Sequence, residues 1–451
     1  MEMKLRFNDL PCYQTEDIMA GSAADKCRNQ CFCIDRLPTV GLQKEFSSFI
    51  LHRGTVLKAS SLRTDLTSYN VVNSFLSEKH PKMESLLELP LDTLVKDMKK
   101  WLLSNGKSLT TREISKRIGK DQQNESVHIR YLRKVYEYLT PEDERPEREK
   151  DIWKLDKLGL ILIDNPIKNT ETINFTKIVQ DEMRKEVKDA AFMELQTRAV
   201  GTVSAEIVAI NRFSSYLAEN FPDVQSMADI NRDIVESYLI YLSTEANDRQ
   251  SYRADIFHLK ALIDLVGRMT DNQRICNLFL ITDIPNNPEK LYKSYSDAEL
   301  KRLNSAIVTA DVQVARALIL HQMLGTRISD TLTLMQDCVF EKDGKLMIRI
   351  YQIKSRRAYR KTINEEILEL INAAIKYTKA HSPDSPYIFA NDKDASRPMT
   401  YAKIQYQLMA IIHENDLRDD NGEQFGVGTH LFRHTYGRKL TEMQVDDTII
   451  A

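Results

Sequence analysis

The sequence predicts a mainly α-helical protein with one small antiparallel β-sheet near its C-terminal end, an α+β arrangement. Three observations support this prediction. The chain has only 14 Gly and 13 Pro among 451 residues, which favours long regular elements. Apolar residues recur at helical spacing through most of the first 290 residues. Alternating apolar residues, interrupted by an Asp-Gly turn, occupy positions 339–363.

The first helical domain is expected over residues 1–150. Tyr69-Asn-Val-Val-Asn-Ser-Phe-Leu76 carries an apolar stripe at i, i+3 and i+4 spacing, and residues 127–139 repeat this pattern before Thr140-Pro141. Residues 141–151 consist of charged residues and proline alone, which is typical of a solvated linker or hinge. We expect a further linker over 151–174.

A second helical domain is expected over residues 175–290. It repeats the order of elements of the first domain: a helix that ends in an aromatic residue and Leu, a polar turn that contains proline, and two further helices. Leu89 follows Phe75 by fourteen residues, and Ile230 follows Tyr216 by the same distance. This order favours a degenerate duplication of one helical module. The alternative is that any two blocks of four helices would look alike when only the order of helices and turns is compared.

The third domain, residues 291–451, mixes helices with the predicted sheet. Ser296 and Glu299 have the spacing of a capping box that opens a helix. An apolar helix over 314–324 ends at Gly325, and strands follow near 339–340, 347–351 and 359–363. Helices are expected again at 365–380, at about 400–414, and from 430 onward.

Charge is balanced overall but not locally. Lys and Arg (63) nearly cancel Asp and Glu (65), so the net charge of −2 gives no general support for nucleic-acid binding. Residues 345–361, however, contain seven Lys or Arg and no acidic residue. The run Leu158–Ile163 is far shorter than a membrane helix, and the N-terminus lacks the apolar core of a signal peptide. These features predict a cytoplasmic protein with no membrane partner.

Cysteine usage leaves two possibilities open. Six cysteines in a chain of this length do not form a disulfide framework. Four of them fall early, at Cys12, Cys27, Cys31 and Cys33, but only the pair Cys27 and Cys31 has the spacing of zinc ligands. Ordinary reduced thiols are therefore favoured over a metal site.

Three basic motifs occur in order within the third domain. They are Leu324-Gly-Thr-Arg-Ile-Ser-Asp330, Ile353-Lys-Ser-Arg-Arg357 at a turn between strands, and Thr429-His-Leu-Phe-Arg-His-Thr435. If Thr429 caps the last helix, His430 and Arg433 project from one face of it. Each motif alone is weak, but the ordered set of Arg, Lys and His-x-x-Arg is specific.

The C-terminal part of the chain resembles the tyrosine recombinase, or phage integrase, family, and especially its longer members carried by transposons and integrative elements. Gly325–Asp330 matches the family's arginine motif, Lys354 matches its hairpin lysine, and His430–Thr435 matches its H-x-L-R-H-T box with Phe432 in place of Leu. The resemblance covers residues 175–451. It implies a helical core-binding (SAM-like) DNA-binding domain at 175–290 and a catalytic domain at 291–451.

The resemblance implies DNA strand cleavage and rejoining through a 3′-phosphotyrosyl intermediate. In its transition state, Arg327 and Arg433 would clamp two non-bridging phosphate oxygens with charge-assisted hydrogen bonds. His430 would add a donor or move the proton of the nucleophile. Lys354 would protonate the leaving 5′ oxygen, and Asp330 would orient Arg327. With this cationic stabilisation, the reaction is expected to need no cofactor and no metal.

The basic turn around Lys354 also predicts contacts to DNA phosphates. Arg356, Arg357 and Arg360 are the expected phosphate-binding residues, because they belong to the same acid-free segment. The expected partner is therefore a double-stranded recombination site. The resemblance implies a homotetramer on DNA for the full-length protein, with possible accessory recombinases or DNA-bending proteins.

One part of the family pattern is not matched. The nucleophilic tyrosine should follow the His-x-x-Arg box at some distance, yet Tyr436, the one tyrosine after Arg433, takes the place of an aromatic core residue. We therefore expect a chain truncated at its C-terminus that binds DNA without cleaving it and is monomeric in solution. The alternative is a non-catalytic DNA-binding protein derived from a decayed recombinase. A helical scaffold without a nucleic-acid role would make the motif series a coincidence.

Overall fold

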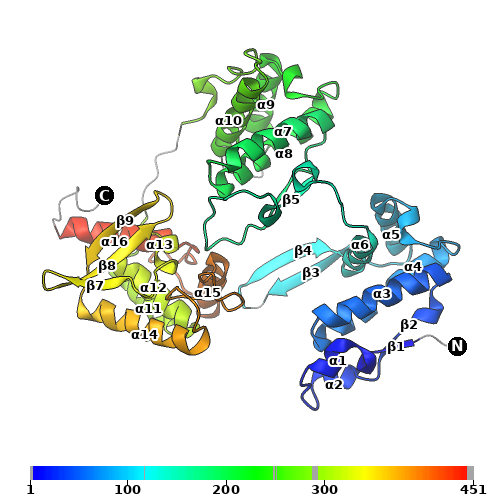
Figure 1. Ribbon diagram of the computed structural model, residues 1–451, viewed down its shortest axis with the longest axis horizontal. Coiled ribbons are helices and arrows are strands. Elements are labelled where there is room, and N and C mark those ends of the chain that lie inside the picture. Colours follow the sequence, from blue (N-terminus) through cyan, green and yellow to red (C-terminus); the bar gives the residue numbers. More distant parts are fainter. Residues whose placement is uncertain (1–3, 116, 247–248, 250, 287–292, 444–451) are drawn as a thin grey trace. The chain divides into compact units, whose positions relative to one another are not determined.

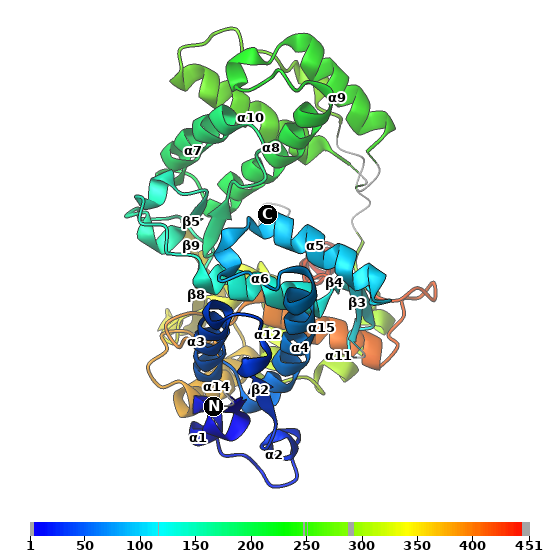
Figure 2. The same cartoon turned by 90° about the vertical axis from the view of Figure 1, so that its right-hand side faces the viewer.

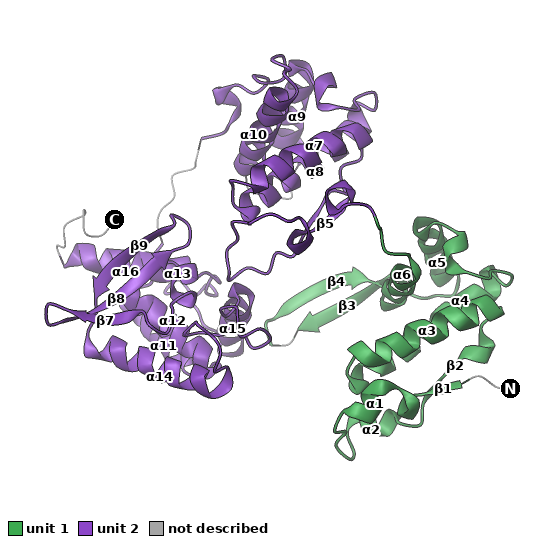
Figure 3. Ribbon diagram, in the orientation of Figure 1, with its two compact units in different colours: residues 1–144 green, residues 145–451 purple. Residues whose placement is uncertain are grey.

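The computed structural model describes residues 4–115, 117–246, 249, 251–286 and 293–443 (Figure 1). The chain folds into two compact units, residues 1–144 and 145–451, which are coloured separately in Figure 3. We describe each unit by itself. The expected fold class, mainly α with small antiparallel sheets, is confirmed.

Unit 1, residues 1–144, is built on four helices that share one apolar core. These are α3 (Val40–Val56), α4 (Leu62–Lys79), α5 (Leu91–Ser104) and α6 (Val127–Leu139). Helix α6 contacts the other three, as can be followed in Figure 2. It does so through Ile129, Leu132 and Val135, whose three-residue spacing places them on one buried face.

Short elements complete the N-terminal part of unit 1. They are β1 (Lys4–Arg6), η1 (Phe7–Asp9), α1 (Pro11–Thr15), α2 (Ala23–Cys27), β2 (Cys31–Cys33), η2 (Ile34–Arg36), η3 (Ala59–Ser61) and η4 (Leu86–Glu88). Strand β1 pairs antiparallel with β2. Cys31 and Cys33 lie two residues apart on β2 and so share one face of it, with their Sγ atoms 3.9 Å apart. All four early cysteines are free. Within the described ranges, no group of three or more His, Cys, Asp or Glu side chains is placed to hold a metal ion.

Unit 1 also contains a β-hairpin in a region where helices are expected from the apolar periodicity. Strands β3 (Thr110–Ser115) and β4 (Lys120–Glu125) pair antiparallel over six residues each. No side chain of either strand is fully buried. The hairpin has no apolar face, so it lacks the alternation of apolar and polar residues by which a strand is usually recognised.

The first part of unit 2 is a helical domain with its own core. It contains η5 (Glu147–Glu149), β5 (Ile152–Lys154), η6 (Leu155–Lys157), β6 (Thr172–Asn174), α7 (Asp181–Leu195), α8 (Val200–Asn220), η7 (Met227–Asp229), α9 (Arg232–Thr244), α10 (Arg253–Met269) and η8 (Ile281–Asp283). Helices α7, α8 and α10 lie side by side in Figures 1 and 2 and contact one another.

The expected linker at 151–174 is part of this domain. Strands β5 and β6 pair antiparallel, and Trp153 and Ile173 are buried in the core formed by α7–α10. The Trp153 ring packs against Phe175 with their centroids 4.6 Å apart. The large, isolated aromatic anchors a segment that is otherwise polar and irregular, so apolar periodicity could not reveal it. Residues 141–146, the charged segment before it, are exposed.

The second part of unit 2 matches the expected order of elements. It contains α11 (Asp297–Ile307), α12 (Val312–Leu324), α13 (Ile328–Leu332), β7 (Val339–Lys342), β8 (Lys345–Gln352), β9 (Arg357–Thr362), α14 (Glu365–His381), α15 (Tyr401–Glu414) and α16 (His430–Glu442). The capping box of Ser296 and Glu299 is confirmed. Asp343 and Gly344 both have positive φ at the predicted turn of the β7–β8 hairpin.

The three strands form one antiparallel sheet in the order β7-β8-β9. Ile348 and Ile350 of β8 face the core, which also contains α12, α14 and α15. Across the described part of the chain, no helix has the length and apolar character needed to cross a lipid bilayer.

Candidate active site

Arg327 is positioned by a sharp turn at the end of α12. Gly325 adopts a left-handed conformation (φ +65°) and closes the helix with a hydrogen bond to His321 O. The chain then turns, and Arg327 becomes the residue that precedes α13. A Cβ at position 325 would overlap the ring of Tyr436, so both the backbone conformation and the close packing require glycine here.

Helix α16 carries His430 and Arg433 on one face, as their three-residue spacing predicts. The Arg433 guanidinium donates a hydrogen bond from Nη1 to Gly325 O at 3.0 Å. This contact joins α16 to the turn that holds Arg327. Two motifs separated by about a hundred residues in sequence are therefore in direct contact.

The expected cap at Thr429 is wrong in its detail. Thr429 precedes α16, but its side chain makes no capping hydrogen bond. Its backbone is helical (φ −72°, ψ −15°), whereas a side-chain cap requires an extended residue. The Thr429 carbonyl instead accepts a hydrogen bond from His321 Nε2 at 3.0 Å, which fixes the start of α16 against α12.

His321 is a positioning residue that sequence reasoning missed. Burial lowers its pKa to about 4, so its ring is neutral at physiological pH. Because a carbonyl only accepts, Nε2 carries the proton, and Nδ1 accepts from the Thr331 hydroxyl at 3.2 Å. One neutral imidazole thereby links α12, α13 and α16. Its position four residues before Gly325 in an apolar helix was the available signal.

Lys354 lies on the turn between β8 and β9, and Asp330 reaches this turn from α13. Asp330 Oδ1 accepts hydrogen bonds from Ile353 N at 3.2 Å and Ser329 Oγ at 3.0 Å. Asp330 Oδ2 lies 4.0 Å from Arg327 Nη1. Burial raises the pKa of Asp330, while the Ile353 N–H and the nearby arginines oppose that rise. The carboxylate thus contacts both the lysine turn and Arg327.

The expected cationic residues lie near His430. The pKa of His430 is lowered first by burial and then by the positive charges of His434, Arg433, Arg327 and Lys354. Two contacts agree with this: Arg433 bonds to Gly325 O close to Arg327, and Asp330 bonds to Ile353 N beside Lys354. Guanidinium, imidazole and ammonium groups placed in this way can bind an anion such as a phosphodiester.

The three expected phosphate-binding arginines do not share one face of the hairpin. Arg356 lies at the β8–β9 turn with a positive φ of 54°, and Arg357 begins β9 opposite Gln352. Arg360 lies opposite Arg349 and over the ring of Phe340, 5.6 Å from its centroid. Because strand side chains alternate, Arg360 faces away from the side that Tyr359 and Lys361 occupy.

Lys361 and Tyr436 form a second contact that the sequence did not reveal. Lys361 Nζ donates to Leu324 O at 2.9 Å and to the Tyr436 hydroxyl, and it lies 4.2 Å from the centre of the Tyr436 ring. The Tyr436 ring also packs over Gly325. Both ends of this tyrosine are therefore engaged within the protein.

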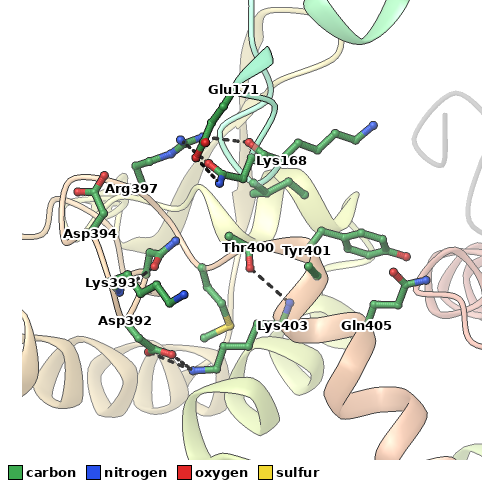
Figure 4. A pocket seen from close by; sticks show the side chains of 15 residues that line it. Lys168, Glu171, Asp392, Lys393, Asp394, Arg397, Thr400, Tyr401, Lys403 and Gln405 are labelled. Atoms are coloured by element: carbon green, nitrogen blue, oxygen red, sulfur yellow. Dashed lines mark hydrogen bonds and ion pairs between the residues drawn. The ribbon is translucent and has the colours of Figure 1, made fainter. Parts of the chain in front are cut away.

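A separate hollow of about 790 Å³ lies in unit 2 between residues 167–171 and the start of α15 (Figure 4). Arg397 crosses it to donate to Asn169 Oδ1 and Lys168 O, each at 2.9 Å. Lys403 donates to Asp392 at 2.8 Å. These cations are already paired, and none of the candidate site residues lines the hollow.

The chain thus has a helical domain followed by a domain in which arginine, histidine and lysine side chains of three motifs lie near the turn of a small sheet. Residues 293–451 match the phage integrase family. This match identifies a phage integrase domain in the last third of the chain, and the chain is similar to tyrosine recombinases.

The relatives include proteins of mobile elements. Transposase B from transposon Tn554 of Staphylococcus aureus is 25% identical over 383 residues, which cover 83% of this chain and 60% of the relative. Tyrosine recombinase XerA of Pyrococcus furiosus is 23% identical over 273 residues, which cover 59% of this chain and 84% of the relative. The chain thus spans about 60% of the length of the transposase that it matches.

Solved structures of DNA complexes are also similar. The XerH site-specific recombinase bound to palindromic difH substrate has 16% sequence identity and a TM-score of 0.45, and the match covers 61% of this chain and 84% of that one. The Tn1549 transposon integrase in complex with circular intermediate DNA has 14% identity and a TM-score of 0.42, with 58% and 89% covered.

Proposed function

We propose that this protein is a site-specific DNA recombinase, or integrase, that moves or integrates a mobile element by DNA strand cleavage and rejoining through a 3′-phosphotyrosyl intermediate. The observation that carries the proposal is that contacts join the three motifs: Arg433 donates to Gly325 O, and Asp330 accepts from Ile353 N and lies 4.0 Å from Arg327. The similarity to a transposase of Tn554 supports the association with a mobile element.

Each residue has a role that its position supports. Arg327 and Arg433 approach the phosphate from two elements that are joined at Gly325, so their guanidiniums can bind both non-bridging oxygens as charge grows there. His430 is neutral over more of the physiological pH range than an ordinary histidine, because its pKa is lowered. It can therefore donate one hydrogen bond and accept the proton of the nucleophile.

Lys354 and Asp330 complete the proposed machinery. Lys354 is exposed on a turn, where its ammonium can reach the leaving 5′ oxygen and give it a proton. Asp330 is a positioning residue, since it binds the Ile353 N–H beside this lysine and lies near Arg327. Arg356, Arg357 and Arg360 would bind phosphates flanking the cleaved bond.

We propose that Tyr436 is not the nucleophile, and that the 451-residue chain binds its recombination site without attaching to it covalently. The Tyr436 hydroxyl is held by Lys361 and its ring packs over Gly325, so attack on a phosphate would require both contacts to break. The partner is a double-stranded recombination site. A homotetramer assembles on paired sites in the full-length protein, with accessory recombinases or DNA-bending proteins as possible further partners.

The test compares the protein expressed from its complete reading frame with the 451-residue chain on a nicked duplex that carries the recombination site. The complete frame should give a covalent protein–DNA product on a denaturing gel, and Tyr436→Phe should leave its yield unchanged. The 451-residue chain should shift the same duplex on a native gel without that product. A covalent product that Tyr436→Phe abolishes would refute the assignment of Tyr436, and no product from the complete frame would refute the proposed reaction.

A further inference from the structure

Unit 1 and the helical domain of unit 2 share a hydrogen bond at equivalent positions. In unit 1, Glu45 of α3 accepts from the backbone N–H of Leu86 at 3.1 Å. In unit 2, Glu186 of α7 accepts from the backbone N–H of Met227 at 2.8 Å. The two glutamates are 141 positions apart in the sequence, and so are their two partners.

The 3₁₀ turns that follow have the same design. Ser85 N donates to Glu88 at 3.0 Å, and Ser226 N donates to Asp229 at 2.9 Å, so each turn is closed by an acid three residues after a serine. The N–H group before each serine bonds to the same acid. These pairs are again 141 positions apart. Each turn then leads into the third helix of its bundle, α5 or α9.

The cores follow the same spacing through the first two helices. The buried pairs at this spacing include Leu42 and Met183, Phe46 and Val187, Val72 and Phe213, and Leu76 and Leu217. A buried acid also recurs: Asp65 pairs with Arg53 at 2.8 Å, and Glu206 pairs with Arg198 at 2.8 Å. The repeat therefore extends from backbone contacts to packing.

The fourth helices align at a shorter spacing. Ile129 and Ile256, Leu132 and Leu259, and Val135 and Leu262 are buried pairs that lie 127 positions apart. The spacing has fallen by fourteen residues between the third and fourth helices, so unit 1 carries an insertion of that length there. The β3–β4 hairpin, Thr110–Glu125, occupies this interval.

The side chains of the inserted hairpin suit nucleic-acid binding rather than packing in an apolar core. Residues 110–125 contain four Lys or Arg and three acidic residues, and Arg112 is paired with Asp121. The other three basic residues fall within residues 116–120, which contain no acidic residue, so the positive charge of the hairpin is concentrated there. Its base is fixed to the bundle: Ser126 N donates to Leu109 O at 2.9 Å, and Arg130 pairs with Glu113 at 2.7 Å. Six paired residues extend about 20 Å, and a two-stranded ribbon of this kind fits the major groove of B-DNA.

We propose that residues 39–139 are a second copy of the helical module at 180–269, and that this copy binds double-stranded DNA through the inserted β3–β4 ribbon. Its exposed amide and cationic side chains contact base edges and phosphates, respectively. The inference rests on the proposed function only in that both require a DNA duplex as partner. It assigns to unit 1 a DNA contact that is independent of the strand-cleavage residues.

The experiment measures the binding of the 451-residue chain to duplexes selected by that chain from a random 40-base-pair library. The ribbon variant is Lys107→Gln with Arg117→Gln and Lys120→Gln. The matched control is Lys58→Gln with Lys79→Gln and Lys82→Gln, three exposed lysines elsewhere on unit 1. We expect the ribbon variant to bind at least tenfold more weakly and its salt dependence, the slope of log K against log salt, to fall by roughly two to three.

Hydroxyl-radical footprinting identifies which part of the duplex is lost. The ribbon variant should lose one block of protection while a second block remains, and a replacement of residues 108–125 by a short Gly-Ser loop should do the same. The lysine control variant should keep both blocks. If the ribbon variants match the control in affinity, salt slope and footprint, the inference is overturned, as it is if the ribbon binds single strands or RNA in preference to duplex. Absence of cleavage by the protein expressed from its complete reading frame, with ribbon-dependent protection retained, would overturn only the proposed function.

Discussion

The guanidinium of Arg433 donates a hydrogen bond to the carbonyl oxygen of Gly325, 3.0 Å away. Gly325 lies two residues before Arg327, so this bond joins the side chain of Arg433 to the turn that carries Arg327. The two arginines that are proposed to bind the reacting phosphate are therefore held by the same turn. A pair of cations preorganised in this way needs little rearrangement as charge develops.

The first prediction concerns these arginines. In the protein expressed from its complete reading frame, Arg327→Ala and Arg433→Ala should each reduce covalent DNA attachment by a factor of about 10² to 10³, equivalent to about 3 to 4 kcal/mol, because each loses a donor to the transition state. Lysine at either position should restore little of the covalent DNA attachment, since an ammonium cannot form two parallel hydrogen bonds. Gel-shift affinity should change only a few-fold. Attachment at the unsubstituted rate by Arg327→Ala would show that the site is elsewhere.

The second prediction separates Lys354 from its basic neighbours. Lys354→Ala should abolish cleavage of a normal duplex but cleave a substrate whose bridging 5′ oxygen is replaced by sulfur, because a thiolate leaves without a proton. Arg356→Ala on the same turn should weaken binding without any such rescue. The measurement is the yield of covalent product from each duplex. If sulfur rescues Arg356→Ala instead, the two roles are reversed.

The third prediction concerns Gly325 itself. Gly325→Ala should destabilise the protein by about 1 kcal/mol from its left-handed backbone and by at least as much again from overlap with the Tyr436 ring. Gly344→Ala is the matched control, because Gly344 has a similar φ of +69° but no atom within 4 Å of the added Cβ. Urea unfolding of both variants measures the difference. Equal losses would mean that packing against Tyr436 contributes nothing.

The fourth prediction is a pH dependence of stability. Burial and then the adjacent Glu194 raise the pKa of Glu206, Arg198 opposes them, and the resulting pKa is about 8. An unfolded glutamate titrates near 4.3, so between about pH 4.5 and 8 the folded state binds more protons than the unfolded state. The free energy of unfolding should therefore fall as pH rises through this window.

A thermal-melting series tests this. The Tm of the unsubstituted chain should fall by roughly 5 °C or more between pH 5 and pH 8, and Glu206→Gln should largely remove this slope, since an amide does not ionise. Glu219→Gln, on an exposed position of the same helix, is the control and should keep it. A slope that Glu206→Gln leaves intact would assign the effect to another group.

Much of the second half of the chain could be predicted from its sequence because local signals and global packing agree there. The capping box at Ser296, the Asp-Gly turn at 343–344, and the spacing of His430 and Arg433 each specify a local geometry that the structure contains. The motif residues could be recognised in the sequence for the same reason, since each lies at a helix end or a turn that has its own local sequence pattern.

The contacts that were missed join residues far apart in the sequence. His321 bonds to Thr429, and Lys361 bonds to Tyr436, so no local pattern reveals either. The β3–β4 hairpin was missed because its polar strands lack an apolar face, and Trp153 because it is a single anchor in an irregular segment. The proposed repeat was visible in the order of elements. Its spacing of 141 positions through the first three helices became evident only through the equivalent hydrogen bonds of Glu45 and Glu186.

Asp330 binds the backbone of the β8–β9 turn but not the side chain of Lys354 on that turn. It holds the Ile353 N–H, whereas no hydrogen bond holds the ammonium of Lys354 within the described residues. In the proposed reaction, Lys354 would therefore move into and out of the site while Arg327 and Arg433 stay bound to the phosphate. Withdrawal of this proton donor would stop strand cleavage without releasing the DNA. Because Asp330 binds the turn and not the lysine side chain, proton donation by Lys354 would be controlled separately from phosphate binding by the two arginines.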